Sequence, residues 1–230
     1  MISVIFDLDG TLVDSEPNYY ASGRRTLEAH GVSGFTWEDH AAFIGIGTLE
    51  TLEVLRERYG IDAPVERLLE QQNDAYLELA RTRTEVYPEM RALVERLRAE
   101  GVPMAVASGS SLAAIEAVLA GTGLDALIPT VVSAEEVPRG KPAPDVFLEA
   151  ARQLGVEPAD CVVFEDAAPG VLAAEAAGMA CVAVPHSPEA AADPAFARAS
   201  LLYPEGQAGF TAAAAYAWLG SRVPAPGSGR

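Results

Sequence analysis

The stretch Ile2-Ser3-Val4-Ile5-Phe6-Asp7-Leu8-Asp9-Gly10-Thr11 decides the fold of this chain. Its first five residues form a short apolar run, which is typical of a buried strand in a parallel sheet. We expect Gly10 to end the strand and to let the backbone turn. Asp7 and Asp9 then lie at the C-terminal end of the strand, which is the edge where open α/β sheets bind ligands.

Two carboxylates this close together repel each other by about 4 kcal/mol at 4 Å in a medium with an effective dielectric constant of 20. A cation at the pair removes that repulsion. The sequence Asp-x-Asp-Gly also suits a strand that ends in an Asx turn without any ligand. We favour the ligand site because the motif follows the strand directly.

The composition excludes several classes of partner. The chain has 230 residues, a formal net charge of −17 and 50% hydrophobic residues. Such an acidic surface argues against nucleic acid, because phosphate backbones recruit basic surfaces. No apolar stretch is long enough to cross a membrane and no signal sequence is recognisable, so we expect a cytoplasmic protein. We also expect a monomer or a weak homodimer. Cys161 and Cys181 lie in apolar runs and are expected to be buried free thiols.

Strand-like and helical segments alternate along most of the chain. This alternation predicts βαβ units and therefore an α/β fold with a Rossmann-like parallel sheet that carries helices on both faces. The strand-like runs after the first are Pro103–Ala107, Ile128–Val132, Cys161–Phe164 and Cys181–Val184, and the clearest helices between them are Glu89–Glu100, Ser111–Ala120 and Asp145–Leu154.

One interval breaks the alternation. Residues 15–83 carry helical patterns at Ser15–His30, Thr48–Tyr59 and Pro64–Ala80, with no convincing strand. An all-helical insert of this length exceeds an ordinary crossover, so we interpret it as a small second domain over the C-terminal edge of the sheet. The core domain then comprises residues 1–14 and 84–220, and residues 221–230 are expected to form a disordered tail.

Other polar residues also follow predicted strands. Ser108 ends one strand just before a helix, where its hydroxyl and the next backbone amides suit an anion, although a plain helix N-cap is the alternative. Glu165 and Asp166 end another strand and form a second pair of acids, which suits a magnesium ion. Their alternative role is a charged helix start that is favoured by the helix dipole.

Lys141 is the only lysine in the chain, whereas the other fifteen basic residues are all arginine. A compact ammonium group fits between carboxylates and a phosphate where a planar guanidinium is too large. The prolines that follow it closely, Pro142 and Pro144, favour a fixed position. Chance retention of one lysine is the alternative.

The order of these motifs resembles that of the haloacid dehalogenase-like hydrolase superfamily, in its branch of capped sugar-phosphate phosphatases and β-phosphoglucomutases. Asp7-Leu8-Asp9-Gly10-Thr11 is similar to the first motif of that superfamily, Ser108 to the second, Lys141 to the third and Glu165-Asp166 to the fourth. The helical insert resembles the cap domain that follows the first motif. Because dehalogenases of the superfamily lack the second aspartate, the presence of Asp9 argues against dehalogenation.

The resemblance implies a mechanism. Asp7 is expected to be the nucleophile that forms an aspartyl-phosphate, and Asp9 the general acid and base. Ser108, Lys141 and the Gly109 amide are expected to bind the transferred phosphoryl group.

The resemblance also implies a Mg²⁺ cofactor. Its expected ligands are Asp7, the Asp9 carbonyl and Asp166, with Glu165 as a direct or outer ligand. The substrate is expected to be a small phosphorylated metabolite such as a sugar or polyol phosphate.

The cap is expected to contact the substrate through Glu16, Asn18, Tyr19 and Thr48. Two of these positions depart from the mutase pattern, because Tyr19 stands where that pattern has a histidine and Thr48 where it has an arginine. A mutase must hold a second phosphate, so both departures favour a phosphatase. Phosphoglucomutase-like transfer, phosphoryl transfer to another alcohol and a non-catalytic binding role remain as alternatives.

Overall fold

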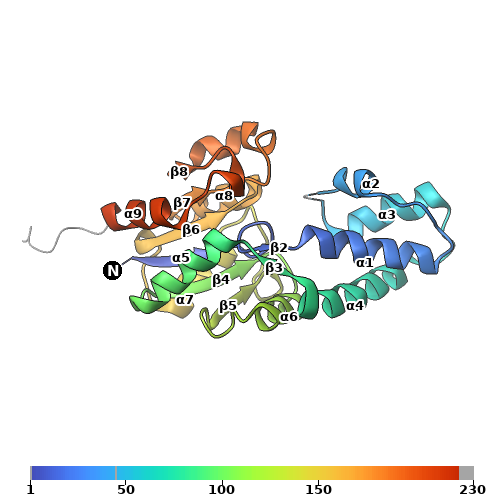
Figure 1. Ribbon diagram of the computed structural model, residues 1–230, viewed down its shortest axis with the longest axis horizontal. Helices are drawn as coiled ribbons and strands as arrows, with labels where there is room; N and C mark the ends of the chain where they lie inside the picture. The colour runs from blue at the N-terminus through green and yellow to red at the C-terminus, as the bar shows by residue number, and fades with distance from the viewer. Residues whose placement is uncertain (1, 45, 223–230) are drawn as a thin grey trace, which may run out of the picture. The chain divides into compact units, whose positions relative to one another are not determined.

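The computed structural model of the chain describes residues 2–44 and 46–222, which divide into two compact units (Figure 1). Unit 1 contains the described residues up to Asp14 and from Glu85 onward, and unit 2 is Ser15–Thr84. The first boundary coincides with the predicted one, and the second lies one residue beyond it. No helix in the described ranges has the length and apolar composition needed to span a membrane.

Unit 1 is built on a six-stranded sheet with the strand order β5-β4-β1-β6-β7-β8, in which all neighbouring strands are parallel. The predicted Rossmann-like parallel sheet is therefore confirmed. Because β1 is central, its C-terminal end lies between those of β4 and β6. The strands are β1 (Ser3–Phe6), β4 (Met104–Ser108), β5 (Thr130–Ser133), β6 (Cys161–Glu165), β7 (Ala180–Ala183) and β8 (Leu201–Leu202).

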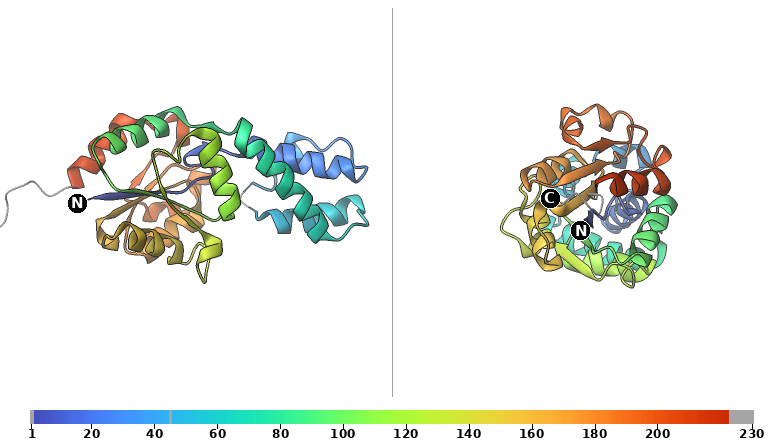
Figure 2. Two further views of the ribbon diagram at one scale, coloured as in Figure 1. Left: turned by 90° about the horizontal axis from the view of Figure 1, so that it is seen from below. Right: turned by 90° about the vertical axis from the view of Figure 1, so that its left-hand side faces the viewer.

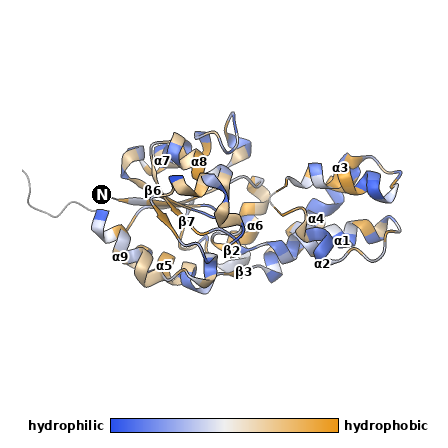
Figure 3. Ribbon diagram, turned by 90° about the horizontal axis from the view of Figure 1, so that it is seen from above, coloured by the Kyte–Doolittle hydropathy of each residue, from blue (hydrophilic) through white to orange (hydrophobic). Residues whose placement is uncertain are grey.

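Helices cover both faces of this sheet. Helices α7 (Asp145–Leu154) and α8 (Ala168–Ala176) pack on the face that carries Ile5 and Val163. Figure 2 shows α5 (Pro88–Ala99), α6 (Leu112–Thr122) and α9 (Ala212–Arg222) on the opposite face. The hydrophobic colour in Figure 3 is concentrated on the strands, as expected for a parallel sheet that is buried on both sides.

The structure also contains elements that the sequence patterns did not predict in unit 1. β8 has only two residues, and α9 includes Ser221 and Arg222 of the predicted tail, whereas residues 223–230 of that tail lie outside the described residues. β5 begins at Thr130 rather than Ile128, since Pro129 has no N–H to donate to a neighbouring strand. The short 3₁₀ helices are η1 (Ala134–Glu136), η2 (Pro158–Asp160), η3 (Ala190–Ala192), η4 (Pro194–Arg198) and η5 (Gly206–Ala208).

The two ends of the insert leave unit 1 through a small antiparallel ribbon. β2 (Val13–Asp14) pairs with β3 (Glu85–Val86), so that Val13 lies opposite Val86 and Asp14 opposite Glu85. The Tyr87 N–H extends this pairing by donating to the Leu12 carbonyl at 3.0 Å. Both connections to unit 2 are therefore fixed to each other within unit 1.

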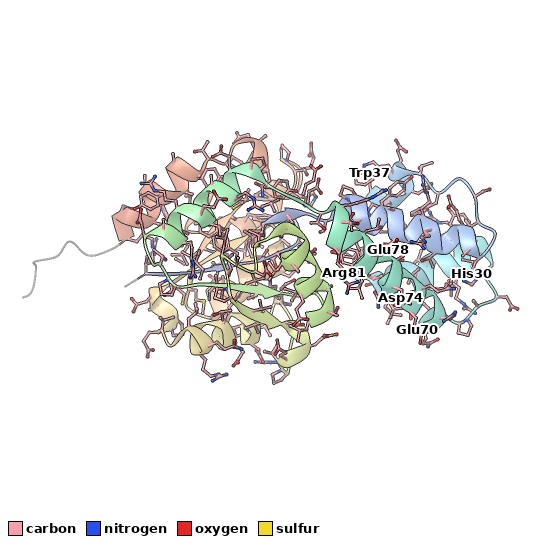
Figure 4. All side chains as sticks on the ribbon, turned by 60° about the horizontal axis from the view of Figure 1, so that its bottom comes forward. His30, Trp37, Glu70, Asp74, Glu78 and Arg81 are labelled. Atoms are coloured by element: carbon pink, nitrogen blue, oxygen red, sulfur yellow. The ribbon has the colours of Figure 1, made fainter. Side chains whose placement is uncertain are left out.

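Unit 2 is helical, with α1 (Glu16–Ala29), α2 (Trp37–Ala41), α3 (Thr48–Tyr59) and α4 (Val65–Arg83). Its core contains Leu27, Leu52 and Leu68. The sequence patterns missed α2, which has five residues and begins at a capping box between Thr36 and Asp39. Figure 4 labels Trp37 on α2 and Glu78 on α4; Glu78 binds Arg25 of α1 at 2.7 Å.

A hydrogen bond joins Asn18, near the start of unit 2, to Thr84, the last residue of the unit. The side chain of Asn18 is 3% exposed, and its Nδ2 donates to the Thr84 Oγ1 at 2.9 Å. The same hydroxyl donates to the Ala80 carbonyl at 3.0 Å. The start of α1 is thereby attached to the end of α4.

Replacement of this amide gives a testable prediction. Asn18→Ala is expected to lower the free energy of unfolding by about 1–2 kcal/mol, because a buried hydrogen bond is lost. Asn73→Ala, at an exposed position of α4, is the control and should change stability by less than about 0.5 kcal/mol. Urea unfolding followed by circular dichroism measures both, and equal stabilities would contradict the role assigned to Asn18.

Candidate active site

Three carboxylates meet where β1 and β6 end. Asp7 follows β1 and is 6% exposed, while Glu165 ends β6 and is 1% exposed. One oxygen from each of Asp7, Glu165 and Asp166 lies within 4.8 Å of the others. Because β1 and β6 are hydrogen-bonded neighbours, the sheet itself brings together acids that are far apart in the sequence.

Lys141 lies between two of these acids. Its Nζ donates to the Asp7 Oδ1 at 2.6 Å and to the Glu165 Oε1 at 2.5 Å, and its side chain is 12% exposed. The other oxygen of Glu165 accepts the Ala167 N–H at 2.9 Å. Both oxygens of Glu165 are therefore engaged in holding Lys141 and the loop after β6.

The loop that carries Lys141 is fixed by a contact between Arg139, which precedes the lysine, and Asp145, which follows it. Arg139 binds Asp145, the first residue of α7, through two hydrogen bonds of 3.2 and 2.8 Å. The ammonium group also lies 4.8 Å from the ring centre of Phe147, which is fully buried. These contacts leave little freedom for the lysine side chain.

The electrostatics of the cluster favour a further cation. Burial raises the pKa of Asp7 to about 8, Lys141 opposes this rise, and the charges of Glu165 and Asp9 add to it. Burial and the charge of Glu165 likewise raise the pKa of Asp166. Burial acts to lower the pKa of Lys141, but the two carboxylates outweigh it and raise that pKa. Three carboxylates thus face one ammonium group, and a divalent cation would keep them ionised.

Asp9 has different partners from the other acids. Its Oδ2 accepts a hydrogen bond of 2.7 Å from the Ser110 hydroxyl and lies 3.5 Å from the Ser108 hydroxyl. Its carboxylate is not part of the group of acids that could hold a metal ion, which is formed by Asp7, Glu165 and Asp166. The acids are therefore divided between a cation side and a serine side.

Two glycines permit the close approach of these acids. A Cβ atom at Gly10 would overlap the Asp166 carboxylate, and one at Gly170 would overlap that of Glu165. Gly10 also has a φ of +79°, a conformation that other residues rarely adopt. This value confirms the turn expected directly after Asp9.

A residue far along the chain supports the same turn. The Gln207 Nε2 donates to the carbonyls of Gly10 and Thr11, at 3.2 and 3.0 Å. The Thr11 hydroxyl lies 3.5 Å from the Asp166 Oδ1. Gln207 therefore stabilises the backbone on which Asp9 and Thr11 are carried.

The structure brings together all the site residues predicted in unit 1. Ser108 is 1% exposed at the end of β4, and Gly109 follows it in an exposed turn. Three supporting residues were not predicted from the sequence, namely Ser110, Ser133 and Gln207. A run of serines after the predicted strand marks Ser110, and the capping-box spacing to Glu136 marks Ser133; Gln207 carries no recognisable signal.

The four predicted substrate contacts of the cap all belong to unit 2. Glu16 binds the His40 Nε2 at 2.8 Å, and Tyr19 stacks on Tyr76 with a centroid distance of 4.3 Å. Asn18 is buried against Thr84, as described above, and Thr48 is the first residue of α3. A groove of about 440 Å³ in this unit is lined by other residues, among them Arg24, Arg25, Glu28 and Glu78.

Comparison with known proteins places the chain among related hydrolases. The model of the haloacid dehalogenase-like hydrolase family matches residues 3–178. The fructose-1-phosphate phosphatase YqaB of Escherichia coli (strain K12) is 37% identical over 183 residues, which cover 79% of this chain and 95% of that protein.

Two further matches differ in how much of the other protein they cover. A bifunctional riboflavin kinase/FMN phosphatase of Arabidopsis thaliana is 34% identical over 192 residues, which cover 81% of this chain but only 49% of that protein. The crystal structure of CbbY from Rhodobacter sphaeroides in complex with phosphate has a TM-score of 0.74 and 25% identity, and the match covers 89% of this chain and 95% of that chain.

The close contact at Gly10 gives a prediction that does not depend on turnover. Gly10→Ala is expected to weaken Mg²⁺ binding by about tenfold or more, because the added methyl group displaces Asp166. Gly123→Ala is the matched control, since Gly123 has a similar φ of +70° but nothing within 4 Å of its Cβ position. Both variants should lose about 1 kcal/mol of stability from backbone strain.

Isothermal titration calorimetry with Mg²⁺ measures the difference between the two variants. Equal Mg²⁺ affinities would show that the Gly10 contact has no influence on Asp166.

Proposed function

Because the chain belongs to the haloacid dehalogenase-like hydrolase family, we propose that it hydrolyses phosphomonoesters of small metabolites, such as sugar or polyol phosphates, with the help of Mg²⁺. The observation that carries this proposal is the Asp7 carboxylate at the end of the central strand, bound by Lys141 and close to Asp166. The similarity to a fructose-1-phosphate phosphatase supports the class of substrate.

In the first step an oxygen of Asp7 attacks the phosphorus atom of the substrate in line with the ester oxygen. The P–O bond to the leaving group breaks, and Asp9 donates a proton to the leaving oxygen. This step leaves an aspartyl-phosphate on Asp7 and an alcohol product.

In the second step a water molecule attacks the phosphorus of the aspartyl-phosphate. Asp9, now ionised, accepts the proton of the water, and the bond between phosphorus and the Asp7 oxygen breaks. The products are inorganic phosphate and the original carboxylate, so Asp9 regains its proton and the cycle closes.

The transferred phosphoryl group needs donors and positive charge. We assign these roles to the Ser108 hydroxyl, the Gly109 amide and the Lys141 ammonium group, which all derive from the same edge of the sheet. Lys141 already lies 2.6 Å from the nucleophile. It therefore stays close to the atom to which the phosphorus becomes bound, where positive charge stabilises the transition state.

The acidic group also suits Mg²⁺, which binds through a few carboxylates and several water molecules. Asp7 and Asp166, together with the Asp9 carbonyl, would hold the ion. Since both oxygens of Glu165 are engaged, we assign Glu165 to the support of Lys141 and to an outer position around the metal. The positive charge of the ion, once bound by these residues, would offset the negative charge of the phosphoryl group and of the carboxylates.

We assign unit 2 the role of a cap that excludes water and selects the leaving group. Glu16, Asn18, Tyr19 and Thr48 remain the candidate contacts. Glu16, Asn18 and Tyr19 each have a side-chain partner within the unit. Thr48 is therefore the first of these positions to vary when the substrate preference is mapped.

Release of inorganic phosphate tests the proposal directly. We expect the chain to release phosphate from some members of a panel of sugar, polyol and small-acid phosphates in the presence of Mg²⁺, and to release none after chelation. Asp7→Asn should reduce release to the background level, because an amide cannot act as the nucleophile. Its circular dichroism spectrum should match that of the wild type.

Two outcomes would contradict hydrolysis. Undiminished release by Asp7→Asn would exclude Asp7 as the nucleophile. Rearranged phosphate esters seen by ³¹P NMR without release of phosphate would instead indicate a mutase or another phosphoryl transferase.

Replacement of the single lysine gives a second prediction. Lys141→Arg keeps the charge, but a planar guanidinium cannot occupy the 2.5 and 2.6 Å contacts of a compact ammonium group. We expect kcat/KM to fall by about 100-fold or more, in line with the loss of an electrostatic donor in other enzymes. Arg152→Lys, at an exposed position of α7, is the control, and a fully active Lys141→Arg would refute the requirement for lysine.

A further inference from the structure

We propose that Ser110 positions Asp9 for proton transfer to the leaving group. This inference rests on the function proposed above. It assigns a role to a residue outside the motifs that identify the family.

The first contact is the bond between the two residues. The Ser110 hydroxyl donates to the Asp9 Oδ2 at 2.7 Å, whereas the Ser108 hydroxyl is 3.5 Å from the same oxygen. A hydrogen bond from a hydroxyl to a carboxylate at this distance is among the stronger bonds that neutral donors make. It fixes one oxygen of Asp9 and thereby the direction in which the carboxyl group delivers a proton.

The other two contacts fix Ser110 itself. Its N–H donates to the Ser108 Oγ at 3.0 Å, and its carbonyl accepts from the Ser133 Oγ at 2.7 Å. Ser133 is fully buried at the end of β5, directly opposite Ser108 in the strand register. The backbone of Ser110 is therefore held by side chains at the ends of two adjacent strands, β4 and β5.

The start of helix α6 does not explain Ser110. That helix begins after Ser111, whose hydroxyl accepts the Ala114 N–H at 3.3 Å, and its Leu112 N–H is bound by Glu135 at 3.0 Å. Other residues thus perform the capping. The hydroxyl of Ser110 is bonded instead to Asp9, the residue assigned to proton transfer.

A positioning role predicts a specific dependence on the leaving group. An alkoxide leaving group, as in a sugar phosphate, needs a proton as the P–O bond breaks, whereas 4-nitrophenolate is stable enough to leave without one. Loss of correct orientation at Asp9 should therefore slow the reaction of alkyl phosphates much more than that of 4-nitrophenyl phosphate. Loss of phosphate binding or of folding would slow both reactions equally.

The experiment compares kcat/KM for the best sugar phosphate of the panel and for 4-nitrophenyl phosphate. For Ser110→Ala we expect a loss of about tenfold or more with the sugar phosphate and of less than about threefold with the aryl ester. Ser110→Thr keeps the hydroxyl and should restore most of the loss. Ser111→Ala, at the adjacent serine, is the matched control and should leave the ratio between the two substrates unchanged.

Two kinetic results would overturn the inference. Equal losses with both substrates in Ser110→Ala would assign Ser110 to phosphate binding or folding, and an unchanged kcat/KM for the sugar phosphate would remove its role. Absence of phosphate release by the wild type would instead refute the proposed function. In that case crystal structures of Ser110→Ala and of Ser111→Ala decide the positioning role, because an unmoved Asp9 carboxylate in Ser110→Ala would overturn it and a displaced one would support it.

Discussion

The attraction between one ammonium group and two buried carboxylates is the interaction on which the rest of unit 1 depends. Asp7 and Glu165 occupy the ends of adjacent strands, and both are bonded to Lys141. Breaking such a buried pair by removing one partner typically costs several kcal/mol, because the remaining charge has no water to solvate it. Neighbouring residues hold these three side chains in place. Gly170 leaves room for Glu165, and the contact between Arg139 and Asp145 fixes the loop that carries Lys141.

The topology of the sheet explains why distant residues share one site. β1 lies in the middle, so Asp7 has the end of β4 on one side and the end of β6 on the other. The serine side of the site therefore lies at the end of β4, and the cation side lies at the end of β6, with β1 between them. This arrangement separates Asp9, which transfers protons in the proposed mechanism, from the acids that form the candidate metal site.

The site residues that directly follow a strand could be predicted from the sequence. The short ribbon and the contacts between distant residues could not. Apolar runs followed by Asp7, Ser108 and Glu165 were sufficient to place these residues at one edge of a parallel sheet, and the bounds predicted for the helix Asp145–Leu154 agree with the structure. The ribbon of β2 and β3 has two residues in each strand, which is too short for a periodic pattern. The contact of Gln207 with Gly10 spans 197 positions and involves backbone carbonyls, so no side-chain pattern encodes it.

The small ribbon at the ends of the insert has an evolutionary consequence. Because Asp14 and Glu85 are paired across two antiparallel strands, the chain leaves the sheet unit and returns to it at almost the same point. A segment with adjacent ends can be lengthened, shortened or exchanged for another without any change in strand order or register. Under the function proposed above, such a junction allows the insert to change while the catalytic residues of the sheet unit stay the same, so that related proteins can share one reaction and differ in substrate.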